Sequence, residues 1–147
     1  MKTVLLTGAG GDVGRRITPM LKARYPKLIL SDMAPFEPLH GCEFRQAELG
    51  DMGAVQRAVQ GVDGIVHLGG FSVEGPWETI LNANIAGCYN LFEAARVAGV
   101  KRIIFASSNH AVGYYPRSET IPTDVTVLPD SRYGVSKAFG EALGAMY

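Results

Sequence analysis

The stretch TVLLTGAGGDVG, residues 3–14, joins a short apolar run directly to a turn rich in glycine. Thr3–Thr7 is typical of a buried parallel strand, and the apolar residues that follow Asp12 recur at helical spacing as far as Arg24. Glycine stands at positions 8, 11 and 14, between these two segments. The order predicts a strand, a tight turn and a helix whose N-terminus faces the space beyond the strand.

Short apolar runs and longer helical segments alternate through the rest of the chain. Further strands are expected at residues 28–31, 43–47, 64–68 and 102–106. Helices are expected at 52–60, 77–98 and 133–146, and irregular chain at 33–41 and 109–132. The alternation predicts an α/β, Rossmann-type, doubly wound parallel sheet in three layers, with strand order 3-2-1-4-5. The apolar run at 102–106 is expected to be as buried as the first and fourth strands.

Length and composition favour a single domain over residues 1–147. Fourteen basic and fourteen acidic residues cancel, so no electrostatic signature of nucleic-acid binding is present. No stretch approaches the roughly 18 apolar residues of a membrane span. The spacing of Cys42 and Cys88 indicates neither a metal site nor a redox pair, and a reducing, cytoplasmic location is expected.

The glycine turn has the chemistry of a phosphate-binding loop. Its G-x-x-G-x-x-G spacing differs from the common G-x-G-x-x-G because Val stands at position 13, but it meets the same physical demands. These demands are a tight turn, close approach of a pyrophosphate to the backbone, and free N–H groups at the start of a helix. The residues expected to bind a dinucleotide here are Gly8, Gly11, Asp12, Val13 and Gly14.

Asp32 follows the second expected strand, about 20 residues after Gly11, the separation typical of a carboxylate that binds ribose hydroxyls. Since Met33 and Ala34 come next and no basic residue is there to accept a 2′-phosphate, NAD is favoured over NADP. A carboxylate that only caps a loop is the alternative. Glu48 and Leu49, after the third strand, are expected beside the adenine.

The fourth expected strand ends in HLGG, residues 67–70. Leu68 and Gly69 lie where a cofactor would need room, whereas His67 is expected to be a core histidine and not a catalyst. The fifth strand ends in two hydroxyl side chains, Ser107 and Ser108, at the same edge of the sheet.

Tyr133 and Lys137 stand four residues apart and therefore lie on one face of the last expected helix. An ammonium beside a phenol favours phenolate, which lets a tyrosine act as a base near neutral pH. Helices also produce this spacing by chance, and the alternative is an amphipathic helix with Lys137 in solvent.

Taken in this order, the motifs resemble those of the extended short-chain dehydrogenases, in the NAD-dependent epimerase/dehydratase group. Within that group the chain is most similar to the uronate (hexuronate) dehydrogenases. The closer likeness is carried by SSNH at 107–110, GYYPR at 113–117 and PDSRYG at 129–134, together with residues 67–70, 72–74 and 76–77. The similarity extends over essentially the whole chain.

The resemblance implies NAD as cofactor and a sugar acid as substrate, a hexuronate oxidised at C1 to an aldarolactone. Ser108 would hydrogen-bond the substrate hydroxyl, Tyr133 would remove its proton, and Lys137 would hold the nicotinamide ribose. Asn84 matches a helix asparagine of the family that supports a water link to the lysine. The further substrate contacts implied are Ser72, Asn109 and His110.

The family pattern also implies strands and a substrate region beyond residue 147. Without these C-terminal strands, the flank of the fifth strand is expected to be an exposed apolar patch. Two alternatives stay open, a nucleotide-sugar epimerase or dehydratase that recycles its NAD, and a dinucleotide-binding module without turnover. Self-association into a homo-oligomer is also left open.

Overall fold

Five parallel strands form one sheet in the order β3-β2-β1-β4-β5, which confirms the predicted topology. The computed structural model describes all 147 residues. The central strand β1 pairs in register with both neighbours, so that Leu5 lies between Ile29 and Ile65. The strands are β1 Thr3–Thr7, β2 Lys27–Asp32, β3 Glu43–Gln46, β4 Gly64–His67 and β5 Arg102–Phe105.

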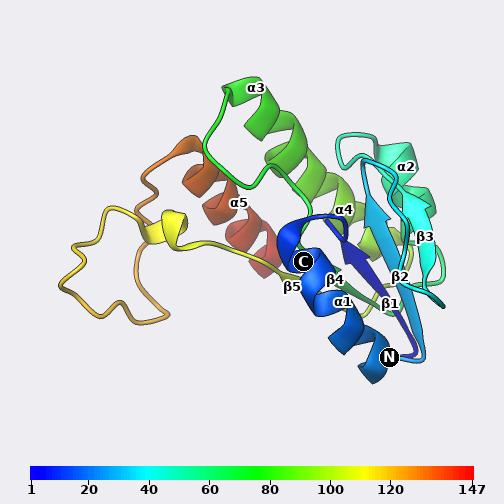
Figure 1. Cartoon of the computed structure of the whole chain (residues 1–147). Coiled ribbons are helices and arrows are strands. Elements are labelled where there is room, and N and C mark those ends of the chain that lie inside the picture. Colours follow the sequence, from blue (N-terminus) through cyan, green and yellow to red (C-terminus); the bar gives the residue numbers. More distant parts are fainter.

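Helices lie on both faces of this sheet, α1 on one side and α2 and α4 on the other (Figure 1). A π-helical segment, η1, separates α3 from α4, and a short 3-10 turn, η2, follows β5. The helical elements are α1 Asp12–Arg24, α2 Met52–Ala58, α3 Trp77–Ile80, η1 Leu81–Ala86, α4 Gly87–Val97, η2 Asn109–Val112 and α5 Arg132–Met146.

The core divides into two apolar layers because successive strand side chains point to opposite faces of the sheet. On one face Leu5, Ile29 and Ile65 pack against α2 and α4. On the other face Val4, Leu6 and their neighbours on β2 pack against Ile17 and Leu21 of α1. The two layers confirm the three-layer architecture expected from the sequence.

The segment predicted as one helix over 77–98 is not a continuous α-helix, because η1 interrupts it. The segment predicted as irregular over 109–132 contains η2 and then extends away from the rest of the molecule (Figure 1). Main-chain hydrogen bonds close the neck of this extension: Leu128 donates to Ala111, and Tyr114 donates to Leu128. No helix is both long and apolar enough to span a membrane.

The burial predicted for strand 102–106 is wrong. The side chain of Ile104 is 56% exposed, and no residue of β5 is fully buried. The reason is position rather than composition, since β5 is an edge strand bonded only to β4. The exposed flank inferred from the resemblance is therefore present.

Candidate active site

The glycine turn passes from β1 into α1 with no room for side chains at two points. Gly8 has a φ of +67°, and a Cβ there would lie 2.8 Å from the backbone of Leu68 and Gly69. A Cβ on Gly14 would lie 2.2 Å from the Gly8 carbonyl oxygen. The turn therefore needs glycine at both positions, and it holds α1 close against the sheet.

The start of α1 offers unpaired N–H groups. Those of Asp12, Val13 and Gly14 have no acceptor within the protein. Asp12 and Val13 are exposed and Gly14 is buried behind them, so the first turn presents the positive end of the helix dipole at the surface. The arrangement suits an anion such as a pyrophosphate.

Asp32 lies beside this turn at the end of β2. Its Oδ2 accepts a hydrogen bond from the Gly10 N–H at 2.9 Å, and the carboxylate is half-buried. Arg15 donates from Nε to the carbonyl of the same glycine at 2.6 Å. The N–H and the carbonyl of Gly10 are thus both hydrogen-bonded to side chains, and Asp32 orders the turn whether or not it also binds a ribose.

The ends of β3 and β4 border the same edge of the sheet. Glu48 is exposed, whereas Leu49 is half-buried and packs against the core. A Cβ on Gly69 would lie 2.9 Å from the Leu49 side chain, and Leu68 stands beside the Gly8 turn. The structure therefore gathers the predicted cofactor residues of four segments around the carboxyl ends of β1 to β4.

Tyr133 and Lys137 lie on α5, which begins one residue earlier than predicted, after the cap Ser131. Lys137 is only 8% exposed, so the alternative of a solvated lysine is wrong. Its Nζ donates to the Ala106 carbonyl at 2.8 Å and lies 5.4 Å from the centre of the Tyr133 ring. Burial lowers the pKa of the Lys137 ammonium, and its interaction with Cys88 partly opposes this shift.

Asn84 lies buried in η1 and joins two distant parts of the chain. Its Nδ2 donates to the Phe71 carbonyl at 2.9 Å and to Ser136 Oγ at 3.0 Å, while its Oδ1 accepts from the Phe71 N–H at 2.7 Å. Ser136 is the neighbour of Lys137 on α5. The protein contacts of Asn84 thus reach the helix that carries Lys137, and no direct bond joins the two side chains.

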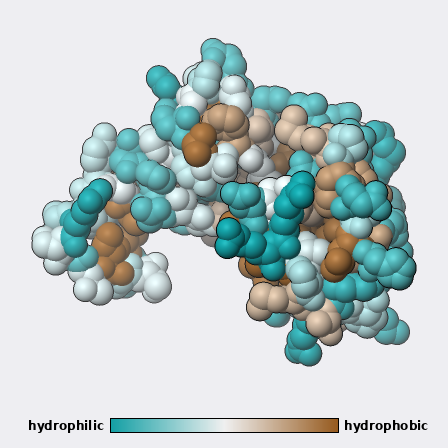
Figure 2. All heavy atoms as spheres, in the orientation of Figure 1, coloured by the Kyte–Doolittle hydropathy of each residue, from teal (hydrophilic) through white to brown (hydrophobic).

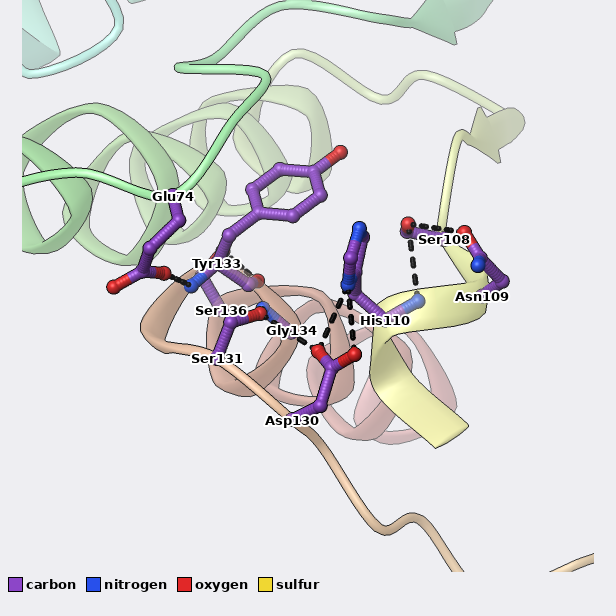
Figure 3. Close-up of polar contacts among 9 residues, drawn as sticks. All are labelled: Glu74, Ser108, Asn109, His110, Asp130, Ser131, Tyr133, Gly134 and Ser136. Atoms are coloured by element: carbon purple, nitrogen blue, oxygen red, sulfur yellow. Dashed lines mark hydrogen bonds and ion pairs between the residues drawn. The ribbon is translucent and has the colours of Figure 1, made fainter. Parts of the chain in front are cut away.

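Ser108 ends the segment after β5 and caps η2. Its Oγ accepts from the His110 N–H at 3.2 Å and donates to Asn109 Oδ1 at 3.3 Å. The His110 ring meets the Tyr133 ring edge to face, with centroids 5.7 Å apart. Figure 3 shows His110 between Tyr133 and Ser108, so three of the predicted residues come together here.

Two further predicted residues stand at the margin of this group. Asn109 is exposed beside Ser108, and Ser72 is exposed in the loop between β4 and α3, where its side chain bonds to no other residue. His67, by contrast, is 2% exposed, with its Nδ1 2.7 Å from the Thr7 hydroxyl. The prediction of a core histidine is confirmed.

Three polar residues of the site were not assigned a role from the sequence. Asp130 contacts the His110 ring, Ser136 bonds to Asn84, and Glu74 accepts from the Tyr133 N–H at 3.0 Å. Each contact joins residues 20 to 59 positions apart in the chain, and no local pattern in the sequence indicates such a pairing. The only sequence signal was that Glu74 and Asp130 lie in segments that carry the resemblance.

Comparison with known proteins gives one family match and several close relatives. Residues 4–147 match the model of the NAD dependent epimerase/dehydratase family. The uronate dehydrogenase of Agrobacterium fabrum is 52% identical over 151 residues, spanning 100% of this chain and 56% of that protein. The uronate dehydrogenase of Pseudomonas syringae pv. tomato is 48% identical, spanning 98% and 53%.

A solved structure agrees with these sequence matches. It is a mutant of uronate dehydrogenase from Agrobacterium tumefaciens complexed with NAD, with a TM-score of 0.96 and 51% identity over 100% of this chain and 56% of that one. The chain thus spans about half the length of the curated relatives it matches. The strand order, the glycine turn and the match over residues 4–147 together establish that this chain belongs to the NAD dependent epimerase/dehydratase family.

Proposed function

We propose that these residues form part of the active site of an enzyme. This enzyme catalyses NAD-dependent oxidation of a hexuronate at C1 and gives the aldarolactone. The observation that carries the proposal is the buried Lys137 beside Tyr133, with Ser108 near by, at the sheet edge where the glycine turn lies. The choice of a hexuronate rests on the 46–52% identity to three uronate dehydrogenases. The reaction class rests on the site.

The residues at the carboxyl ends of β1 and β2 fit NAD. The free N–H groups of Asp12, Val13 and Gly14 would hold the pyrophosphate, since they are unpaired and lie at a helix N-terminus. Asp32 would accept from the ribose hydroxyls, and its negative charge would disfavour a 2′-phosphate. Gly8 and Gly11 would allow close approach, and Glu48, Leu49, Leu68 and Gly69 would border the rest of the cofactor.

The proposed chemistry needs a base and a positioned hydroxyl. Tyr133, as phenolate, would take the proton of the C1 hydroxyl, and Ser108 would hydrogen-bond the same oxygen. Lys137 has two N–H donors beyond the one given to Ala106, which would hold the nicotinamide ribose, and its Nζ lies 5.4 Å from the centre of the Tyr133 ring. When bound, NAD supplies the acceptor for the hydride that leaves C1.

Asn84 would act by holding other parts of the site in place. Its bonds to Phe71 and Ser136 fix α5 against the loop after β4, and a water link from it to Lys137 stays a prediction. Ser72, Asn109 and His110 would contact the sugar acid. Asn109 and His110 lie in η2 beside Ser108 (Figure 3), and Ser72 lies in the loop whose Glu74 accepts from the Tyr133 N–H. Positioning of this kind supplies much of the rate in such reactions.

The test is NADH absorbance when the 147-residue protein is mixed with NAD and glucuronate or galacturonate. Turnover that Tyr133→Phe lowers by at least about 100-fold, and that Tyr114→Phe leaves unchanged, would support the proposal. Tyr114 is the matched control because it is 71% exposed on the extended loop. NAD binding without turnover would favour the dinucleotide-binding module, and conversion of a nucleotide sugar without NADH release would favour an epimerase or dehydratase.

A further inference from the structure

Asp130 holds the ring of His110 by one of its two nitrogens. His110 Nδ1 lies 2.8 Å from Asp130 Oδ1 and 3.0 Å from Oδ2. The two side chains are 46% and 27% exposed, so the pair lies at the surface of the site and not in the core. The contact joins the first turn after β5 to the residue that precedes the cap of α5.

Several separate contacts keep the carboxylate in place. The Ser131 hydroxyl donates to Asp130 Oδ1 at 2.9 Å, and the Asp130 N–H donates to the His110 carbonyl at 3.3 Å. Two glycines leave the necessary space: a Cβ on Gly113 would lie 2.1 Å from Asp130 Oδ2, and a Cβ on Gly134 would lie 2.2 Å from the His110 carbonyl oxygen. Contacts from both η2 and the start of α5 therefore hold the His110–Asp130 pair in place.

The chemistry of the pair decides where the imidazole proton lies. The hydrogen bond from His110 holds the pKa of Asp130 below its usual range, so the carboxylate is ionised near neutral pH and can only accept. In the neutral imidazole, Nδ1 must then carry the proton, which leaves Nε2 with a free lone pair. Figure 3 shows Nε2 pointing away from Asp130, toward the side on which the Tyr133 and Ser108 hydroxyls lie.

We propose that Asp130 is a positioning residue that fixes His110 with its proton on Nδ1, so that Nε2 accepts a hydrogen bond from a hydroxyl of the sugar-acid substrate. The hydrogen bond from a substrate hydroxyl to Nε2 rests on the proposed function. The position of the proton on Nδ1 rests only on the contacts of Asp130. A hydrogen-bonded imidazole of fixed orientation would distinguish a polyhydroxylated substrate from an apolar alcohol of similar size.

The first experiment measures the tautomer directly, by the nitrogen chemical shifts of the histidine rings in the 147-residue protein at about pH 8.5, about two units above the ordinary pKa of an imidazole. The chain has three histidines, and a His110→Gln variant identifies the signals of His110. We expect a protonated Nδ1 and an unprotonated Nε2 in the unchanged protein. Asp130→Asn should abolish this preference, while Asp124→Asn, the same change on an exposed part of the loop, should leave it unchanged.

A second variant separates positioning from loss of charge. Gly113→Ala keeps the carboxylate but places a methyl group where Oδ2 lies, so it should disturb the tautomer as Asp130→Asn does. Backbone amide spectra of both variants show whether the fold is retained. An unprotonated Nδ1, a doubly protonated ring, or a His110 spectrum that neither variant changes would overturn the inference, whether or not the protein turns over.

The second experiment tests the contact between His110 and the substrate, by measuring the kinetics of hexuronate oxidation at saturating NAD. Loss of one oriented acceptor should raise KM for the hexuronate roughly 3- to 10-fold in Asp130→Asn, with a smaller change in kcat and unchanged NAD affinity. Asp130→Glu, which keeps the charge, should recover part of the loss. A fall in kcat alone with unchanged KM would contradict a substrate role while leaving the proposed oxidation intact.

Discussion

At the scale of single residues, His67 shows how burial fixes a protonation state in the core beneath the candidate site. Its ring lies between β1 and β5, bonded to the Thr7 hydroxyl and 5.7 Å from the centre of the Phe105 ring. Burial lowers its pKa to about 3, and the positive charge of Lys137 adds to the shift. The folded protein therefore keeps this histidine neutral at neutral and mildly acidic pH.

The neutral His67 makes stability depend on pH. Between about pH 3 and the ordinary histidine pKa of 6.5, His67 is protonated in the unfolded chain but stays neutral in the folded chain. Stability should therefore fall as pH decreases across this window, by at most about 1.4 kcal/mol per pH unit. Urea denaturation at about pH 7 and about pH 5 would measure the slope above the range in which carboxylates titrate.

The control for this prediction is a pair of histidine variants. His67→Asn should remove most of the slope between these two pH values, whatever it does to stability itself. His40→Asn changes an exposed histidine and should leave the slope as it is. Equal slopes in all three proteins would show that His67 is not the group responsible.

The residue scale also marks a limit of prediction from sequence. His67 could be assigned to the core because it lies within an apolar strand, and Asp32 could be placed because its distance from the glycine turn is set by one strand–helix–strand unit. The Asp130 contact to His110 had no such basis. It depends on how an extended loop returns to the start of α5, which no local pattern encodes.

At the scale of elements, the π-helical segment η1 is the feature that could not be predicted from the sequence. Helical periodicity continues through Leu81–Ala86, and neither proline nor glycine marks the change from α- to π-helical turns within it. The wider turns end at Gly87, whose missing Cβ admits the Leu49 side chain. Since π-helical segments are frequent at functional sites, the position of Asn84 within this one agrees with its proposed role.

Asn84→Ala tests how much η1 depends on that side chain. The change removes three hydrogen bonds and leaves the Phe71 N–H and carbonyl without their partner. We expect a loss of about 1–3 kcal/mol in the free energy of unfolding, measured by urea denaturation. Asn82→Ala, an exposed change in the same segment, should cost less than about 0.5 kcal/mol, and equal losses would show that Asn84 has no special part.

At the scale of the whole molecule, the two edge strands of the sheet differ in polarity. The β3 edge strand carries Glu43, Arg45 and Gln46, whereas β5 presents Ile104 to solvent at 56% exposure. Around Ile104 a shallow apolar hollow is lined by residues that include Met1, Val4, Tyr25 and Val66. Figure 2 shows further apolar side chains on the extended loop and along the body of the molecule.

An exposed apolar edge strand favours association between molecules. We expect the 147-residue protein to self-associate as its concentration rises, and Ile104→Lys to reduce this association in sedimentation measurements. Val97→Lys, which changes a 66% exposed valine at the end of α4, is the matched control. A protein that stays monomeric at high concentration, or that responds equally to both changes, would contradict the expectation.

The topology could be predicted from sequence because buried parallel strands and amphipathic helices each leave a periodic pattern. The exposure of β5 could not be read from its residues, since an apolar edge strand and an apolar central strand have the same composition. Its exposure depends on what packs against the strand. Only the family pattern beyond residue 147 pointed to it.

The closed neck of the extended loop has a consequence for how the protein can change. Because Ala111, Tyr114 and Leu128 are joined by main-chain bonds, the chain between them begins and ends at fixed points, whatever its length. The entropy of closing such a loop grows only with the logarithm of its length, by about 0.6 kcal/mol for each doubling. Insertions and deletions within residues 116–126 should therefore be tolerated, so related sequences can differ in the length of this loop while the residues around Tyr133 keep their positions.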